Sequence, residues 1–241
     1  MFFQRIKNIF QQTIADLKYP GIKKYFYLSL LFTFILTGIF TYLFYAFVLV
    51  YLSGLSGLAS DISFIDVLIN SIIFKILIII LQFFASWVFF SFILIPIGNI
   101  VSGYYADHIF DILNKKNRNK YKFKRKQNAF SLTLIFSIQT ALRTFLVNLL
   151  LIPLYFIFPV VNIFLFILVN GYFVGREFSG NFLIQFHDQE YLKKYFLYNN
   201  KEIYTLGCVI TFLYTLPLVN LFAPFIANVG FANLILGSKK I

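Results

Sequence analysis

The hydrophobic pattern divides the chain into one amphipathic stretch and four long apolar stretches. Residues 2–17 place apolar side chains on one helical face, and Arg5, Lys7 and several glutamines on the other. Four uncharged stretches follow, at residues 25–52, 76–101, 144–175 and 203–236. Each exceeds the roughly 20 apolar residues that span a hydrocarbon core. The pattern predicts an integral membrane protein whose first helix lies in the membrane interface; packing of that helix on a partner is the alternative.

Breaks within the apolar stretches predict how the chain turns. A Gly/Ser-rich segment, SGLSGLASD, separates two long spans. A Pro-x-x-Asn sequence occurs three times, at residues 96–99, 159–162 and 217–220, and predicts a helix break at each. The later apolar blocks, 129–175 and 203–236, each have charged ends on the same side, so each is predicted to be a helical hairpin. The first is long enough for two full crossings, whereas the second has only about 17 residues per arm and favours partial penetration.

These patterns predict an all-α integral membrane protein forming one domain over residues 1–241. A second interfacial helix is expected where Tyr191, Leu192 and Tyr195 share a face and Asp188 can cap the start. The expected elements are interfacial helices at 2–18 and 188–200, long transmembrane helices at 22–52 and 64–111, and hairpins at 129–185 and 203–236.

The placement of positive charge predicts the topology. The net charge is +12, and 19 of the 21 Lys and Arg residues lie in residues 1–24, 102–128, 176–202 and 239–240. The loop at 53–66 carries none of them. The positive-inside rule therefore places both termini in the cytoplasm and loop 53–66 outside. The basic run KKNRNKYKFKRK fits this topology and anionic lipid better than it fits nucleic acid.

The composition and motifs give no sign of catalysis. Only 12% of the residues are charged, about half the share in soluble domains. No metalloprotease, nucleophile-elbow, P-loop or dinucleotide motif is present. Asp107, His108 and Asp111 could share a helix end, but a solvated helix end explains them better than a metal site does. We expect no metal, no cofactor and no enzymatic activity, and the single cysteine, Cys208, excludes an internal disulfide.

Three charges in the apolar blocks are candidates for an ion pathway. Arg143 lies well inside block 129–175, where an arginine either faces the interior of a bundle or snorkels to the interface; the sequence leaves both readings equal. Arg176 and Glu177 end that block, and their adjacent opposite signs predict local pairing with a structural rather than a catalytic role.

The segment YPGIKKYF, residues 19–26, is the candidate anion site. Glycine lets a ligand approach the backbone closely, and the first amides of a helix carry the positive end of its dipole. Gly21 and Ile22 would supply amides, and Lys23 and Lys24 would supply charge, to an oxyanion. Juxtamembrane lysines are also common as simple anchors, and from these residues alone anchoring is the commoner reading.

Three segments resemble the CysZ-type sulfate permeases, within the wider etoposide-induced-protein family of membrane proteins. They are PGIKKYF, ILVNGYFVGREFSGNFL and LYTLPLVNLFAPFIANVGFANL. The resemblance implies two long transmembrane helices, two half-penetrating helical hairpins and interfacial helices. It also implies sulfate uptake across the bacterial inner membrane for cysteine synthesis, in a homo-oligomer.

The resemblance also implies a sulfate site at Gly21, Ile22 and Lys23. Here Lys23 replaces the arginine of the family's Gly-Leu-Arg segment, so the bidentate fork is lost, and Lys24 could compensate as a second point charge. The resulting prediction is an inner-membrane transporter or channel for sulfate or a related oxyanion that supplies sulfur assimilation. The alternative is a non-transporting membrane scaffold or assembly factor, and an integral-membrane enzyme ranks third. The expected partners are the anion, the lipid bilayer and further copies of the chain, with no nucleic acid.

Overall fold

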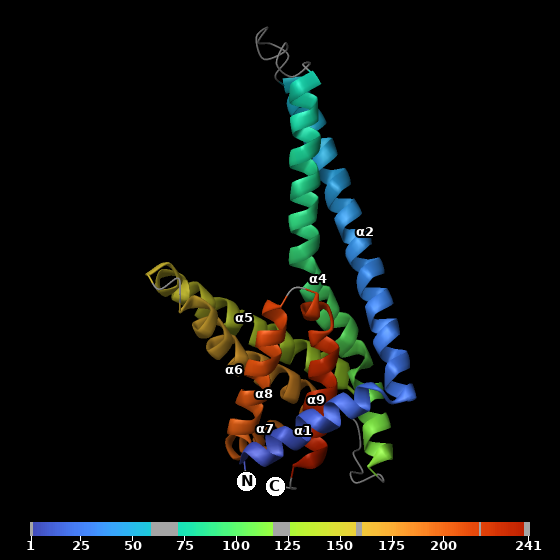
Figure 1. The fold of residues 1–241 in the computed structure, drawn as a ribbon, viewed down its shortest axis with the longest axis vertical. Coiled ribbons are helices and arrows are strands. Elements are labelled where there is room, and N and C mark those ends of the chain that lie inside the picture. The colour runs from blue at the N-terminus through green and yellow to red at the C-terminus, as the bar shows by residue number, and fades with distance from the viewer. Residues whose placement is uncertain (1, 59–71, 118–125, 158–160, 217, 239–241) are drawn as a thin grey trace. The chain divides into compact units, whose positions relative to one another are not determined.

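The described part of the chain is helical. The computed structural model describes residues 2–58, 72–117, 126–157, 161–216 and 218–238, and no strand occurs among them (Figure 1). The predicted all-α class is confirmed. The elements are α1 (Phe2–Leu17), α2 (Pro20–Leu58), α4 (Ile72–Lys116), α5 (Ala129–Ile157), α6 (Asn162–Leu183), α7 (Gln189–Tyr198), α8 (Asn200–Thr215), the 3₁₀ turn η1 (Val219–Leu221) and α9 (Ala223–Gly237).

Two described helices are long and apolar enough to cross a membrane. These segments are Pro20–Val48 in α2 and Ser131–Tyr155 in α5, and shorter apolar segments occur at Ile76–Phe90 and Ala223–Gly237. The start of the second predicted span, residues 64–71, lies outside the described residues. The half-penetrating depth of the hairpins stays a prediction.

Helix α4 corrects one predicted break. The sequence predicted that Pro-x-x-Asn would interrupt the helix at residues 96–99, yet the backbone there is helical on both sides and throughout. A proline removes only one donor from the helix ladder, and transmembrane helices tolerate this where neighbouring groups satisfy the freed carbonyl. The motif therefore does not act as a turn at this position.

The chain folds as two compact units, and the sequence of the second unit is inserted between two segments of the first. The first unit contains residues 1–29 and 102–241, and the second unit contains residues 30–101. The first unit thus combines α1, the start of α2, the end of α4 and helices α5 to α9. The second unit consists of the remaining parts of α2 and α4.

Glycines let α6 and α8 pack backbone to backbone in the first unit. A Cβ atom on Gly207 of α8 would lie 2.0 Å from the carbonyl oxygen of Gly171 and 2.8 Å from the amide nitrogen of Gly175 in α6. A Cβ on Gly171 would lie 2.8 Å from the Cα of Cys208. This is the small-xxx-small packing that lets membrane helices approach closely. The crossing of α6 and α8 therefore depends on residues without side chains.

Helix α9 is the centre of the first unit's core. It packs against α1, α6 and α8 (Figure 1). Its residues from Ala223 to Leu236 are almost all buried. The ring of Phe231 stacks on that of Phe178 in α6, with centroids 5.8 Å apart. On the α1 side, Thr13 lies next to Gly230. Helix α1 thus packs on a helix of its own chain along one stripe, while Phe3 and Ile14 stay exposed.

Polar side chains join α5 to α6. The amides of Asn148 and Asn170 exchange two hydrogen bonds of 2.8 and 3.2 Å, and the Tyr155 hydroxyl donates to the Asn148 oxygen at 3.0 Å. Nearer the other end of the pair, the Ser137 hydroxyl donates to the Asn181 oxygen at 3.1 Å. Bonds at these positions require the helices to run antiparallel. Hydrogen bonds of this kind hold apolar helices together where the hydrophobic effect is weak.

The connection from α6 to α7 contains the two polar residues His187 and Asp188. The Asp188 carboxylate accepts a hydrogen bond from the Tyr191 amide at 2.8 Å, which confirms the predicted cap of α7. The His187 ring stacks on the Tyr191 ring at 3.8 Å between centroids, and the Lys126 ammonium donates to the His187 carbonyl. This turn therefore ties α7 to the segment that precedes α5.

We expect the stability of the first unit to fall as the pH drops below about 6.5. Burial lowers the pKa of His187, the nearby Lys126 charge acts in the same direction, and Asp188 opposes them. The unfolded chain then binds more protons than the folded chain, so stability is present above the unfolded pKa and is lost as the pH falls toward the lowered one. Thermal unfolding of the detergent-solubilised protein at pH 7.5 and 5.5 measures this loss. His187→Gln should reduce the difference between the two pH values; an equal difference in wild type and His187→Gln would contradict the assignment.

Candidate functional site

The predicted anion site lies at the turn between α1 and α2. The Tyr19 carbonyl accepts hydrogen bonds from the amides of Ile22, at 3.0 Å, and Lys23, at 2.9 Å. Helix α2 therefore begins with a tight turn at Pro20, whose missing N–H is no loss in the first turn. Because the Ile22 and Lys23 amides both donate to the carbonyl of Tyr19, which precedes α2, the backbone donor left for a ligand in this turn is that of Gly21.

The side chains of this turn divide between the interior and the surface. Ile22 is fully buried and fixes the start of α2, while Lys23 and Lys24 are exposed. A Cβ on Gly21 would lie 3.3 Å from a ring carbon of Tyr19 and 3.5 Å from the end of Ile112. A side chain would crowd this point, so glycine keeps the backbone accessible there. The arrangement offers two ammonium groups and the positive end of a helix dipole to an anion.

A buried carboxylate holds the turn in place. Asp16, at the end of α1, pairs with the Lys116 ammonium from α4 and accepts a hydrogen bond from the Asn233 amide of α9 at 2.8 Å. Its backbone carbonyl accepts the Tyr19 amide at 2.9 Å. The Lys116 ammonium also lies 5.3 Å from the centre of the Tyr19 ring. Three helices thus meet at Asp16, which the sequence did not single out.

Aromatic rings fasten the first turns of α2 to the last turns of α4. The Tyr25 ring lies 5.4 Å from that of Tyr105 and 5.2 Å from that of His108. His108 is exposed beside this contact. Across the described part of the chain, no three His, Cys, Asp or Glu side chains are grouped closely enough to hold a metal ion. The ring contacts therefore position the turn at the start of α2.

Arg176 stacks on aromatic rings rather than pairing with Glu177. Its guanidinium lies 4.4 Å from the centre of the Tyr172 ring and 5.3 Å from that of Phe196. The ion pairs seen among the described residues do not include the predicted one between Arg176 and Glu177. Neighbouring side chains on a helix point about 100° apart, so Arg176 and Glu177 face different directions. Tyr172 lies one turn before Arg176 on the same helical face, where the guanidinium can reach its ring. The Nε of Arg176 is buried and has no hydrogen-bond partner.

Arg143 lies on the exposed side of α5. The polar groups that join α5 to α6, including Ser137 and Asn148, belong to another face of the helix. Among the described residues, no ion pair includes Arg143.

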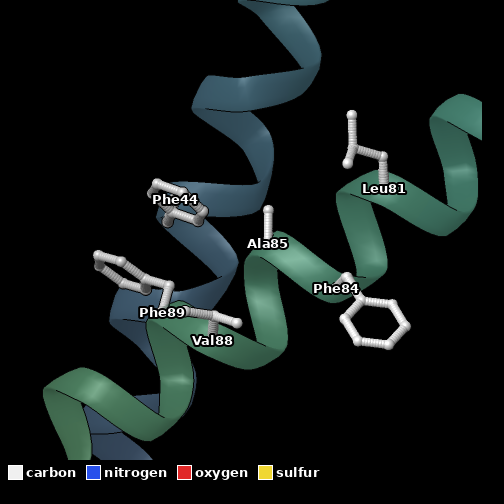
Figure 2. A pocket seen from close by; sticks show the side chains of 6 residues that line it. All are labelled: Phe44, Leu81, Phe84, Ala85, Val88 and Phe89. Carbon is white, nitrogen blue, oxygen red and sulfur yellow. The ribbon is translucent and has the colours of Figure 1, made fainter.

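The second unit contains an apolar cavity between α2 and α4. It has a volume of about 430 Å³ and is lined by Phe44, Leu81, Phe84, Ala85, Val88 and Phe89. Figure 2 shows the rings of Phe44 and Phe89 side by side, stacked at 4.1 Å between centroids. None of the lining side chains carries a polar group. The cavity suits hydrocarbon and cannot hold an anion.

Comparison of the sequence with models of protein families found a match over most of the chain. A family model described as sulfate transporter CysZ/etoposide-induced protein 2.4 matches residues 9–224. The chain belongs to this family. The match extends over the anion-site turn and the described helices from α2 to α8, and the family is associated with transport rather than with catalysis. No match was found among curated proteins or among solved structures. The family and the apolar helices together identify a membrane protein.

Proposed function

We propose that the protein is a transporter or channel for sulfate or a related oxyanion, and that it supplies sulfur assimilation. The observation that carries the proposal is the position of Lys23 and Lys24, both exposed on the first turn of an apolar helix, in a chain of this family. Both termini would lie in the cytoplasm, because the basic segments cluster on one side of the predicted spans. The membrane would be the bacterial inner membrane, and the active form a homo-oligomer.

The anion would be held without covalent chemistry. Lys23 and Lys24 would provide point charges, and the Gly21 amide together with the helix dipole would orient one oxygen. Ammonium groups lack the planar fork of arginine, so they select for charge more than for oxyanion geometry. We therefore expect weaker discrimination among divalent oxyanions than an arginine at position 23 would give. No cofactor is needed for this function.

The second candidate is a membrane scaffold or assembly factor that does not transport. One observation favours it: the Ile22 amide is bonded to the Tyr19 carbonyl, so the turn offers fewer backbone donors than an anion cradle uses. In that case Lys23 and Lys24 are anchors at the membrane rim. The two candidates differ in whether the protein carries an anion flux, and the role of Lys23 and Lys24 is tested separately.

Uptake of radiolabelled sulfate into proteoliposomes tests the proposal. We expect Lys23→Ala/Lys24→Ala to lower the initial rate about tenfold at low sulfate, because each lost charge removes a charge-assisted contact. The matched control is Lys193→Ala/Lys201→Ala, which removes the same charge at two other exposed positions and should leave uptake unchanged.

The other outcomes decide between the candidates. Equal uptake by both double variants would keep transport and make Lys23 and Lys24 anchors. Absence of uptake of sulfate and related oxyanions by the wild type, in liposomes where the protein is folded and oriented, would favour the scaffold.

A further inference from the structure

Arg176 is a charged side chain that makes ring contacts but no hydrogen bond within the described part of the chain. Its guanidinium lies over the rings of Tyr172 and Phe196, 4.4 and 5.3 Å from their centres, and no ion pair among the described residues includes it. The Nε atom is covered by protein, whereas the two terminal nitrogens are not covered in this way. Because a charged donor left without an acceptor is costly, the terminal nitrogens call for an acceptor from outside the chain.

The two rings fix the direction of this guanidinium. Tyr172 belongs to the same helix as Arg176, and Phe196 comes from α7, so the group is held between two helices. A guanidinium that is already fixed loses little freedom when it binds a ligand, and its terminal nitrogens present two parallel donors. Two parallel donors match two oxygens of one oxyanion. The next carboxylate in the sequence, that of Glu177, faces another direction and does not occupy them.

The start of α8 lies beside Arg176 and adds backbone donors. Gly175 packs so closely on α8 that a Cβ atom there would lie 2.5 Å from the Ile203 carbonyl oxygen. Phe196, which contacts Arg176, lies one turn before Asn200, the first residue of α8. The Ile203 amide donates the first helical hydrogen bond of α8, and no side chain caps this helix. The amides before Ile203 are therefore open to an acceptor, and they carry the positive end of the helix dipole.

We propose that Arg176 and the start of α8 form a second oxyanion site at the level of the lipid headgroups. Its ligand is a tetrahedral oxyanion that accepts two hydrogen bonds from the guanidinium, and the source is either free sulfate or the phosphate of an anionic phospholipid. Residues 176–202 carry four Lys and Arg residues and are predicted to lie at the cytoplasmic rim, where both sources are present. The site has the planar fork that Lys23 lacks, so it selects for oxyanion geometry as well as for charge.

Equilibrium binding of radiolabelled sulfate to the detergent-solubilised protein tests the free ion, the source for which this inference rests on the proposed function. The assay uses the Lys23→Ala/Lys24→Ala background, so that the predicted site on α2 does not contribute. We expect Arg176→Gln to weaken binding about tenfold, because the fork and its charge are both lost. Arg176→Lys should weaken it about threefold, because an ammonium keeps the charge and the ring contacts but not the fork. The matched control is Lys193→Gln, which removes the same charge from an exposed position on α7 and should leave binding unchanged.

Thermal unfolding with added phospholipid tests the headgroup as the source. If the ligand is a lipid phosphate, phosphatidylglycerol should raise the unfolding temperature of the solubilised protein by about 3 °C more than phosphatidylcholine does. Arg176→Gln should remove this difference, and Lys193→Gln should keep most of it. Unfolding of each variant in detergent alone shows whether it is folded, and Arg176→Lys replaces Arg176→Gln if the latter is not.

The two measurements together decide the inference. Sulfate binding that depends on Arg176 assigns the site to the free ion, and a lipid effect that depends on Arg176 assigns it to the headgroup. The inference is overturned if neither ligand binds, or if the variants at Arg176 bind both ligands as well as Lys193→Gln does. The proposed function is measured as flux and stands in that case. Absence of flux in the wild type, with binding at Arg176 intact, would remove the proposed function and leave this site.

Discussion

Replacing Gly207 by alanine is expected to destabilise the protein severely, by about 3 kcal/mol or more. The added methyl group would lie 2.0 Å from the Gly171 carbonyl oxygen and 2.8 Å from the Gly175 nitrogen. Both atoms belong to the backbone of α6, so no rotamer change can relieve the clash and the two helices must separate. The separation also loosens α9, which packs on both. Thermal unfolding and size-exclusion chromatography of the detergent-solubilised protein measure the loss.

Other glycines of the chain provide matched controls for this substitution. Gly38→Ala and Gly103→Ala add the same methyl group to helices where nothing lies within 4 Å, and alanine has the higher helix propensity. We expect both to match or exceed the wild type in stability. Gly230→Ala, whose Cβ would meet only Leu206 and Thr13 at 3.6 Å or more, should be tolerated. A Gly207→Ala protein as stable as Gly103→Ala would show that α6 and α8 are not in backbone contact.

Replacing Lys116 by methionine is expected to cost about 3 kcal/mol, the lower end for breaking a buried ion pair. Methionine keeps the packing of the stem but leaves the Asp16 carboxylate with the Asn233 amide as its side-chain partner. The Asp16 side chain is 7% exposed, so water cannot replace the lost ammonium, whereas the Lys116 side chain is 41% exposed. The penalty therefore comes from the carboxylate and not from the lysine. Chemical unfolding of the solubilised protein gives the free energy.

A double-mutant cycle separates this charge effect from lost packing. Asp16→Asn removes the charge and keeps an oxygen that can accept from Asn233, so we expect it to cost only about 1 kcal/mol. The double variant Asp16→Asn/Lys116→Met should then be more stable than Lys116→Met alone, because no charge is left without a partner. Strictly additive free energies would refute the pairing seen between α1 and α4.

Short-range patterns predicted the helices well. Helices were expected at 2–18 and 188–200, and the structure has helices at Phe2–Leu17 and at Gln189–Tyr198 with its Asp188 cap. Their place in the membrane interface stays a prediction. Helical periodicity and capping act within one or two turns, so the sequence displays them directly. The continuation of α4 through residues 96–99 could not be predicted in this way, because local chemistry alone favours a break there.

Long-range contacts were not predictable from the same patterns. Gly171 and Gly175 carry a recognisable small-xxx-small spacing, yet nothing in the sequence identifies Gly207 as the residue opposite them. The pairing of Asp16 with Lys116 and Asn233 is likewise set by tertiary packing. The exposure of Lys23 and Lys24 was predictable, because charged residues at the start of an apolar helix lie at its surface. The hydrogen bond from the Ile22 amide to the Tyr19 carbonyl was not, because it depends on the backbone geometry of the first turn of α2.

The contact between α1 and α9 gives the first unit a required order of assembly. Asp16 and its partner Asn233 are separated by 217 residues, and the whole second unit is synthesised between them. At roughly 5–20 residues per second, the ribosome needs on the order of 10–40 s to cover that interval. Throughout that interval the α1 surface that will meet α9 has no partner, because α9 is made after the other described helices. Helix α1 is therefore made before the other described helices, yet it is among the last of them to reach its final place.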